Sequence, residues 1–524
     1  MTVESRSERA FVLGLDGVPW QLIERWTADG SLPHLTRLVK EGASGPLEST
    51  MPPTTAVAWP SIATSVGPDY HGIYSFRQLT SQYQHNVNTS DDRQAPAVWN
   101  MLSPAIVANV PMTYPAENIE GQLVAGMMTP SFDHQFTQPA SLTQEITEEI
   151  PDYQIGLDWS SYEGREDAFL SDLETLLSAR RSLMRKLMTA DDWRLFFFVY
   201  TEPDRLQHLI WDENVIHEHY QQLDEIVGEV MAYVEEHHAT LYVISDHGFG
   251  PIDGLVHANH VLATHGLLTP ATSGSRNLLE SLGITKDSVL GLSRRLGLTE
   301  ERLKKLPAPL LDRVAANVPG GHSLYDVDFE DTQAFVYGGR CVYVNDTERF
   351  EAGTVPPSEV AQVKDAVIDA FASIRHPQTG APLLDTYDGE TLFPADPDSP
   401  DLVVASQDEY LVDTGVRGPT IAPKDRDGAH HREGIMLAWG PDIVPTHLDG
   451  ATVFDVIPTL LHGVGEPIPK PTNGDVLTEC FAPNSVPATR EVTTKAVERG
   501  DGRRQITGDF TEVEGRLRGL GYIE

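Results

Sequence analysis

The sequence predicts an α/β fold with a mostly parallel central sheet. Apolar runs at Ala10–Asp16, Trp193–Tyr200 and Thr240–Ser245 have the composition of strands buried on both faces, as in parallel sheets. Residues 167–188 and 215–236 carry apolar side chains at helical spacing, which predicts amphipathic helices. Because 524 residues exceed the usual size of one compact domain, we expect one large domain with insertions, or two domains.

The composition is strongly acidic. The formal net charge is −39 and the isoelectric point is about 4.7. This argues against an extended nucleic-acid surface, which needs clustered Lys and Arg. Only 9 of the 38 basic residues are Lys, and the acidic residues are evenly spread. We expect a halophilic protein whose acidic surface stays hydrated at high salt; the alternative is an ordinary acidic protein.

The sequence indicates neither secretion nor a membrane anchor. The N-terminal residues MTVESRSERA lack the apolar region of a signal peptide, and no apolar run approaches the length of a spanning helix. Cys341 and Cys480 are the only cysteines, and they lack the spacing of a zinc knuckle. We therefore expect a cytoplasmic protein without a transmembrane segment. The oligomeric state cannot be read from the sequence.

The first strand, Ala10–Asp16, ends in a carboxylate that is followed by Gly17. Ligands of open α/β sheets gather at the carboxyl ends of the strands, so Asp16 is a candidate site residue. The alternative is that Asp16 caps the next helix.

Two adjacent hydroxyls, Thr54 and Thr55, stand in the segment Met51–Phe76 just before an expected helix start at Trp59–Thr64. The positive end of a helix dipole favours an alkoxide and a bound phosphate, which makes a threonine there a candidate nucleophile. The alternative is a simple N-cap.

Acidic and histidine side chains also follow the next two strands. If Asp204 opens a helix, the i,i+4 spacing puts its carboxylate and the His208 imidazole on one face, where both can bind one metal ion. The alternative is an N-cap aspartate with a surface histidine. Asp246 and His247 directly follow the strand Thr240–Ser245, and Gly248 permits a sharp turn beside an ion.

The second half of the chain is harder to divide. We expect residues 1–265 and 331–485 to form the catalytic domain, with a smaller α/β insertion around 349–400, and residues 486–524 to form a tail. Residues 266–330 are expected to be an inserted helical cap, whose basic residues cover an anionic substrate or form a solvated helix face. These residues are Arg294, Arg295, Arg302, Lys304, Lys305 and Arg313. Ala334–Asn345 has the pattern of a hairpin that turns at Gly338–Gly339.

A polar loop at Lys424–Arg432 supplies His430 and His431 as candidates for a last metal ligand. The chain thus offers seven donors, enough for two metal ions. Two ions about 4 Å apart can clamp an in-line phosphoryl displacement, and a metal-bound Thr hydroxyl loses its proton more easily. The seven donors are Asp16, Thr55, Asp204, His208, Asp246, His247 and His431.

The segments that carry these donors resemble the alkaline phosphatase superfamily, most closely its type I phosphodiesterase/nucleotide pyrophosphatase branch of archaeal type. The resemblance implies a three-layer α/β/α sandwich with an inserted cap. Matching stretches run in family order over Ala10–Pro469: LGLDGVPW, PPTTAVAWPSIATSVGPDYHGIYSF, VPMTYP, FVYTEPDRLQH, ISDHGFGP, HHREGIMLAWGP and DVIPTLLHGVGEPIP.

The resemblance also implies two metal sites and a covalent mechanism. Asp16, Thr55, Asp246 and His247 would hold one ion. The second ion would be held by Asp204, His208 and His431, with His431 preferred to His430 because it precedes ArgGlu-x-Gly-like residues. Thr55 would attack phosphorus and form a phospho-threonine. The sequence departs from the family where Phe76 replaces an Asn that touches the phosphate, where Ser65 replaces a Gly, and at Ala56–Ala58.

We therefore expect a metal-dependent hydrolase of phosphate diesters or pyrophosphate bonds, acting on a small-molecule phosphate ester without stable nucleic-acid binding. Mixed histidine and carboxylate ligands suit two Zn²⁺ ions, and Mn²⁺ or Fe is also compatible. The alternatives are a phosphomonoesterase, sulfatase-like or phosphotransferase member of the superfamily. A further alternative is a protein that binds an anionic polymer or lipid head group around structural metals.

Overall fold

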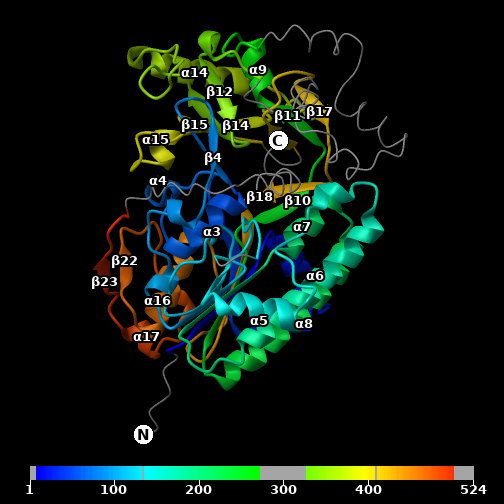
Figure 1. Ribbon diagram of the computed structural model, residues 1–524, viewed down its shortest axis with the longest axis vertical. Helices are drawn as coiled ribbons and strands as arrows, with labels where there is room; N and C mark the ends of the chain where they lie inside the picture. The colour runs from blue at the N-terminus through cyan, green and yellow to red at the C-terminus, as the bar shows by residue number, and fades with distance from the viewer. Residues whose placement is uncertain (1–7, 133–134, 272–325, 407–409, 501–524) are drawn as a thin grey trace.

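The fold is described from a computed structural model, in which residues 8–132, 135–271, 326–406 and 410–500 are placed. These residues form a larger α/β body and a smaller body above it (Figure 1). None of the helices in these ranges is long and apolar enough to cross a bilayer. Both cysteines, Cys341 and Cys480, are buried and free.

A ten-stranded sheet crosses the larger body in the order β20-β2-β19-β9-β1-β8-β5-β6-β7, and β21 pairs with β2. Its strands are β1 (Ala10–Leu15), β2 (Ala43–Glu48), β5 (Ala105–Ala108), β6 (Gly121–Val124), β7 (Thr137–Gln138), β8 (Leu195–Tyr200), β9 (Thr240–Ile244), β19 (Glu433–Trp439), β20 (Thr446–His447) and β21 (Ala451–Thr452). The central strands β9, β1, β8, β5 and β6 are parallel, whereas β19 runs antiparallel to β9 and β2. The predicted α/β class with a mostly parallel sheet is confirmed.

The central strands fix where the polar residues that follow them emerge. All six residues of β1 and all six of β8 are buried, which explains their apolar sequences. The two strands pair in register up to Leu15 and Tyr200, and the Asp16 N–H donates to the Tyr200 carbonyl at 2.9 Å. The side chains that follow β1 and β8 therefore leave the sheet at the same level.

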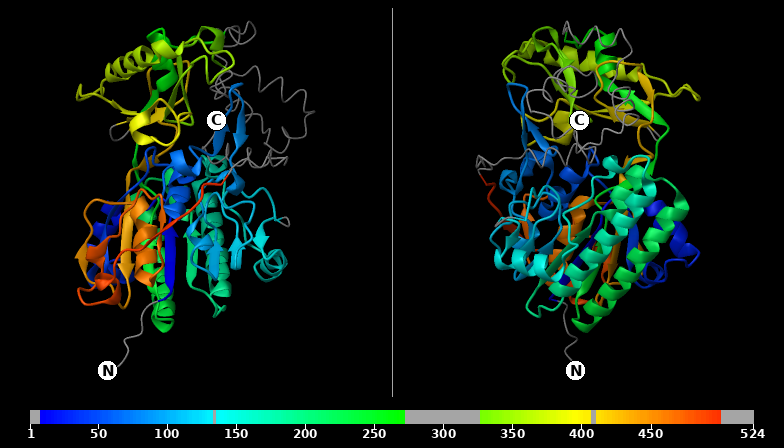
Figure 2. Two further views of the ribbon diagram at one scale, coloured as in Figure 1. Left: turned by 90° about the vertical axis from the view of Figure 1, so that its left-hand side faces the viewer. Right: turned by 45° about the vertical axis from the view of Figure 1, so that its right-hand side comes forward.

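Helices cover both faces of the sheet (Figures 1 and 2). On one face α6 (Glu166–Leu187) and α8 (Glu213–Glu236) lie side by side and are joined by ion pairs from Arg181 to Glu225 and Glu229. The Asp224 carboxylate of α8 accepts the N–H groups of His34 and Leu35 and so caps the N-terminus of α2. The bounds of the neighbouring helices are α1 (Trp20–Ala28) and α2 (Pro33–Glu41). The opposite face carries α3 (Thr55–Thr64) and α16 (Val456–Val464).

The smaller body has its own hydrophobic core, built around residues 256–416. Its described residues form a sheet β12-β13-β15-β14, a sheet β16-β11-β17 and helices that include α9 and α14. The elements are α9 (Ala258–Thr264), α14 (Val360–Ala372), β11 (Gly254–His257), β12 (Ala334–Tyr337), β13 (Cys341–Val344), β14 (Leu384–Asp388), β15 (Leu402–Ser406), β16 (Tyr410–Asp413) and β17 (Ile421–Pro423). We call this body the cap.

The cap is thus larger than the sequence analysis expected. The hairpin at Ala334–Asn345 exists, but β12 and β13 pair with each other and β13 pairs with β15 in the cap, not with the main sheet. The sequence of an apolar hairpin predicts that its two strands pair with each other, but it does not predict which sheet they join. For this reason the sequence assigns residues 331–348 to the catalytic domain, whereas the structure places this hairpin in the cap. The expected helical segment with its six basic residues falls mostly at 272–325, outside the described residues.

The cap also contacts the segments that precede and follow α3 in the larger body. Met51 packs with Phe393 and Val403 of the cap, and the Tyr74 hydroxyl donates to the Asp396 carboxylate at 2.8 Å. The other short elements are β3 (Arg77–Leu79), β4 (His85–Val87), α5 (Ser141–Glu149), α15 (Gly389–Leu392), β22 (Ile468–Lys470), α17 (Val486–Thr489) and β23 (Thr494–Ala496).

The packing of α3 on β1 generates a stability prediction. A Cβ atom at Gly14 would lie 2.4 Å from Trp59 Cη2 and 2.8 Å from Val199 Cγ2, so Gly14→Ala forces α3 away from the sheet. We expect a loss of about 1–3 kcal/mol in the free energy of unfolding, measured by urea denaturation. Gly156→Ala is the control, because nothing lies within 4 Å of that position. Equal stability of the two variants would contradict the packing.

Candidate metal centre and active site

Five carboxylate and imidazole side chains meet at the carboxyl edge of the parallel strands, and a sixth, His430, joins them from β18 (Gly428–His431). Asp16 follows β1, Asp246 and His247 follow β9, and Asp204 and His208 lie in α7 (Glu202–Leu209), directly after β8. Histidine and aspartate on α7 share one face, as their i,i+4 spacing predicts. These five side chains are all buried.

The side chains form two groups of three, and within each group the possible ligand atoms lie within 4.8 Å of one another. The first group contains Asp16, Asp246 and His247, with His247 Nε2 at 3.6 Å from Asp16 Oδ1 and at 3.3 Å from Asp246 Oδ2. The two groups adjoin, because His247 Nε2 is 4.0 Å from Asp204 Oδ1.

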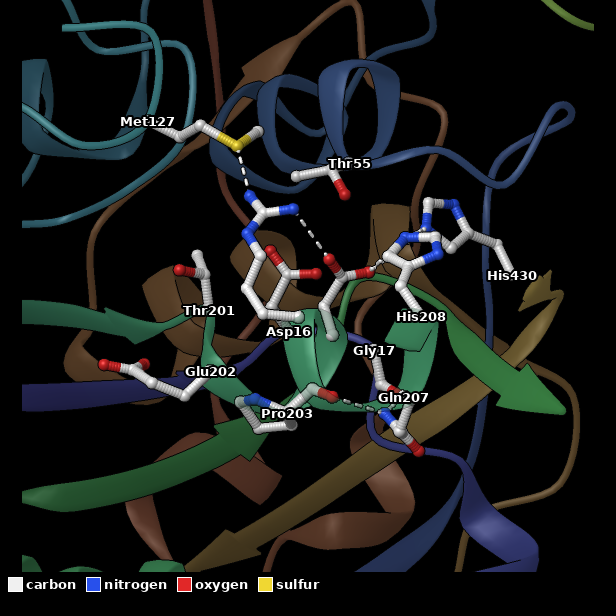
Figure 3. A network of polar contacts seen from close by, with 12 residues as sticks. Asp16, Gly17, Thr55, Met127, Thr201, Glu202, Pro203, Gln207, His208 and His430 are labelled. Carbon is white, nitrogen blue, oxygen red and sulfur yellow. Dashed lines mark hydrogen bonds and ion pairs between the residues drawn. The ribbon is translucent and has the colours of Figure 1, made fainter. Parts of the chain in front are cut away.

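The second group contains Asp204, His208 and His430 (Figure 3). Asp204 Oδ1 lies 3.5 Å from His208 Nε2 and 3.1 Å from His430 Nε2. The two imidazole Nε2 atoms are 3.0 Å apart, which brings them to one point beside the carboxylate. Neutral imidazole and carboxylate together are the donors that Zn²⁺ and similar ions accept.

The structure places His430, and not the expected His431, in this group. Both residues belong to β18 (Gly428–His431), which pairs with β10 (Gly248–Pro251). Successive side chains of a strand point to opposite faces, so only one of two adjacent histidines can face the site. The His431 ring lies instead against Gly250, where a Cβ atom would be 2.2 Å from its Cε1. We therefore replace His431 by His430 in the candidate set.

Thr55 is the first residue of α3 and is buried at the edge of the first group. Its Oγ1 lies 3.2 Å from His247 Nε2, and Figure 3 shows Thr55 facing the carboxylates from the helix above. The helix begins earlier than the expected start at Trp59. Thr54 occupies the N-cap position but makes no side-chain capping hydrogen bond. The structure thus brings together six of the seven sequence-derived donors, with His430 in place of the seventh.

Main-chain carbonyls orient two of the imidazole rings. His247 Nδ1 lies 2.9 Å from the Gly248 carbonyl and His430 Nδ1 lies 3.2 Å from the Pro53 carbonyl. A carbonyl oxygen only accepts, so Nδ1 of each ring is the donor of this hydrogen bond, and Nε2 of each ring faces the carboxylates. Metal-binding histidines in proteins are typically held in this way, with one ring nitrogen donating to the protein and the other free for the ion.

Two further residues contact the carboxylates and were missed in the sequence. Arg205 is buried, and its Nη1 donates to Asp204 Oδ2 at 3.0 Å, while the Met127 sulfur lies against its Nη2. Trp59 Nε1 donates to Asp16 Oδ2 at 3.1 Å. The position of Arg205 directly after Asp204 is a weak local signal, and the contact of Trp59 with Asp16 depends on the packing of α3.

Burial and mutual repulsion dominate the electrostatics of the site. Burial, followed by the charges of Asp246 and Asp204, raises the pKa of Asp16 well above its usual range. Burial and the charge of Asp204 raise the pKa of Asp246 to about 8. Burial also acts to raise the pKa of Asp204, but His208, His430 and Arg205 outweigh it and hold that pKa well below the usual range.

The imidazoles of His208 and His247 carry no positive charge that could offset the three carboxylates. Burial lowers the pKa of His208 to about 4 and that of His247 well below its usual value, so both are neutral at pH 7. Among the described residues, Asp16 Oδ1 and Asp246 Oδ2 have no hydrogen-bond donor. Three buried carboxylates with neutral imidazoles and one arginine form a donor set that fits divalent cations.

Comparisons with known proteins give a matching family model and similar folds. Residues 10–432 match the family model described as Type I phosphodiesterase / nucleotide pyrophosphatase. The fold is similar to murine ectonucleotide pyrophosphatase / phosphodiesterase 5, with 13% identity and a TM-score of 0.51 over 90% of this chain and 100% of that chain. The fold is also similar to an inactive threonine-to-alanine variant of the murine protein in complex with AMP, with 12% identity and a TM-score of 0.51 over 90% of this chain and 100% of that chain.

A second solved relative in fold is phosphonoacetate hydrolase from Sinorhizobium meliloti 1021, in complex with phosphonoacetate. It shows 15% identity and a TM-score of 0.52 over 87% of this chain and 95% of that chain. A search of curated proteins gives no match. At these identities the solved structures establish a shared fold.

The raised pKa values of Asp16 and Asp246 predict a pH effect on the metal-free protein. The folded state holds protons that the unfolded state has released, so stability falls as the pH rises through the folded pKa values. Between pH 7.5 and 9, where the histidines of the unfolded chain are largely neutral, we expect a loss of about 1 kcal/mol. Chemical denaturation of chelator-treated protein measures it.

Asp246→Asn provides the control, because it removes the group with a folded pKa of about 8 and relieves the repulsion on Asp16. This variant should lose less stability than the unmodified protein over the same pH interval. A metal-free protein whose stability is flat or rises between pH 7.5 and 9 would contradict the electrostatics of the site.

Proposed function

The chain belongs to the type I phosphodiesterase/nucleotide pyrophosphatase family, and we propose that it hydrolyses phosphate diesters or pyrophosphate bonds through Thr55. The chain is an enzyme of the phosphoester hydrolase class, as its family is. The observation that carries the finer proposal is the orientation of His247 and His430. Each ring is fixed through Nδ1, so that Nε2 faces buried carboxylates beside the Thr55 hydroxyl.

We propose that two divalent metal ions bind here, with Zn²⁺ the first choice because the donors are imidazole and carboxylate. Asp16, Asp246, His247 and Thr55 would hold one ion. Asp204, His208 and His430 would hold the other. When bound, such ions supply Lewis acidity that lowers the pKa of a hydroxyl and neutralises phosphate charge.

The protein residues have distinct tasks in the proposed reaction. Thr55 Oγ1 attacks phosphorus from the N-terminus of α3, where the helix dipole favours both the alkoxide and the phosphate. The oxygen–phosphorus bond to the leaving group breaks as the bond to Thr55 forms, and water then cleaves the phospho-threonine. Arg205 holds the Asp204 carboxylate in place through the 3.0 Å hydrogen bond from Nη1.

The murine relative supports this role for a threonine, because its threonine-to-alanine variant is inactive and forms a complex with AMP. That observation concerns the murine protein. For this chain, bis-p-nitrophenyl phosphate, p-nitrophenyl phosphate and p-nitrophenyl sulfate, assayed in parallel with Zn²⁺ or Mn²⁺, separate diesterase, monoesterase and sulfatase activity. Because the net charge is −39, we propose adaptation to high salt, so these assays are run in molar salt.

Removing the nucleophile is the first mutational test. Thr55→Ala should lower diester hydrolysis at least about a thousandfold, because the covalent step has no attacking group. Thr54→Ala is the matched control, since its hydroxyl makes no capping hydrogen bond and the residue precedes α3. Full activity of the Thr55→Ala variant with metal bound would disprove the covalent mechanism.

The adjacent histidines provide a test of the metal ligands. His430→Ala should weaken binding of the second ion about 10–100-fold, because one of three protein ligands is lost. His431→Ala should retain two metal equivalents, since its ring lies against Gly250. Titration calorimetry and metal analysis of both variants measure the difference. The reverse pattern would restore His431 to the ligand set.

A further inference from the structure

A turn of the cap reaches the metal-ligand strand. It joins β12 to β13 through Gly338 and Gly339, whose φ angles of +63° and +86° make the reversal possible. A Cβ atom at Gly338 would be 3.4 Å from the Ser75 Oγ, in the loop that follows α4 (Pro68–His71), the next helix after that of Thr55. The next residue, Arg340, points Nη2 at the His430 carbonyl, at 3.5 Å.

The Arg340 guanidinium has no acidic partner within the part of the chain that the structure describes. Among the described residues its side chain makes this one long contact and no ion pair with a carboxylate. A guanidinium has five N–H donors, so most of its hydrogen-bonding capacity is unused. Burial lowers the pKa of Arg340 to about 10, which leaves the side chain charged at neutral pH.

Another arginine of the cap shows what a structural role looks like. Arg349 is ion-paired with Asp346 and Asp401, and its Nη1 donates to the Ser399 carbonyl at 3.0 Å. The chain has 77 acidic and 38 basic residues, yet the partly buried Arg340 has no carboxylate partner among the described residues. The Arg340 charge does not stabilise the cap through a described ion pair.

Arg340 also stands outside the metal-ligand set. The cation that contacts Asp204 is Arg205, whereas Arg340 faces the main-chain carbonyl of His430. The imidazole of His430 faces Asp204. The guanidinium, which belongs to the cap, therefore contacts the main chain of the residue whose imidazole faces Asp204.

We propose that Arg340 binds a second anionic group of the substrate, a carboxylate or a phosphate, beyond the phosphate that is cleaved. The proposal rests on the proposed function, because it takes the two ligand groups as the binding site of the reacting phosphate. A guanidinium matches either anion in a bidentate manner. A local cation also offsets the repulsion that a chain of net charge −39 exerts on an anionic substrate.

The test compares inhibitors that differ by one anionic group. Methylphosphonate and phosphonoacetate share a phosphonate, and phosphonoacetate adds a carboxylate. Inhibition of bis-p-nitrophenyl phosphate hydrolysis is measured in the metal-loaded full chain. In Arg340→Gln the inhibition constant of phosphonoacetate should rise about tenfold or more, while that of methylphosphonate changes less than about twofold. Arg340→Lys, which keeps the charge, should restore part of the loss.

Arg375→Gln is the matched control, because Arg375 is an exposed cap arginine that contacts the Ala372 carbonyl, and it should behave like the unmodified protein. Methylenediphosphonate, measured in the same way, distinguishes the two anions: the inhibitor that loses more affinity in Arg340→Gln identifies the second group. The proposal would be overturned if Arg340→Gln weakened binding of methylphosphonate and phosphonoacetate equally. It would also be overturned if the variant bound phosphonoacetate and methylenediphosphonate, the two inhibitors with a second anionic group, as tightly as the unmodified protein.

Failure of the proposed function gives a different result. If the metal-loaded protein hydrolyses no ester, the hydrolase proposal fails, and calorimetric titration with the same inhibitors still tests Arg340. Selective loss of phosphonoacetate or methylenediphosphonate binding in Arg340→Gln would then support the anion site. Unchanged binding of both would refute it.

Discussion

The burial of three carboxylates at one edge of the sheet is the constraint that the rest of the site satisfies. Asp16, Asp204 and Asp246 follow β1, β8 and β9, whose parallel register brings their ends together. Charged groups removed from water need compensation. Arg205 compensates Asp204, whereas burial, and after it the charge of neighbouring carboxylates, raises the pKa values of Asp16 and Asp246. Divalent cations would supply that compensation, and this links the stability of the edge to its proposed chemistry.

Orientation of the imidazoles is the second condition, and the backbone meets it. The Gly248 carbonyl belongs to β10, and the Pro53 carbonyl precedes α3. The segment that contains Pro53 leads into α3, which begins at Thr55. The strand β10, which begins at Gly248, pairs with β18. Thr55, which is the proposed nucleophile, the two rings and their hydrogen-bond acceptors are therefore held by elements that pack on the sheet, which limits their freedom to move relative to one another.

Much of this arrangement is predictable from the sequence, for a physical reason. Strands buried on both faces are apolar along their length, so β1, β8 and β9 and the polar residues at their ends stand out. His430 and His431 are both candidates in the sequence, and His431 is preferred there because of the residues that follow it. The segment Lys424–Arg432 is polar and gives no sign that β18 is a strand, so the sequence does not show which of the two rings faces the site. The extent of the cap and the contacts of Arg205 depend on pairings between distant segments. A local pattern does not encode these.

The chain path couples the cap to the metal-ligand set. The chain enters the cap through β10 and β11 and returns through β17 and β18, so the ribbon of β10 and β18 connects the two bodies. His430 lies in this ribbon and contacts both sides: its ring faces Asp204, and its carbonyl faces Arg340. A group bound by Arg340 would therefore lie next to β18, the strand that carries the proposed metal ligand His430. Under the two proposals, elements packed on the main sheet would position Thr55 as the nucleophile, and Arg340 of the cap would bind what extends beyond the reacting phosphate.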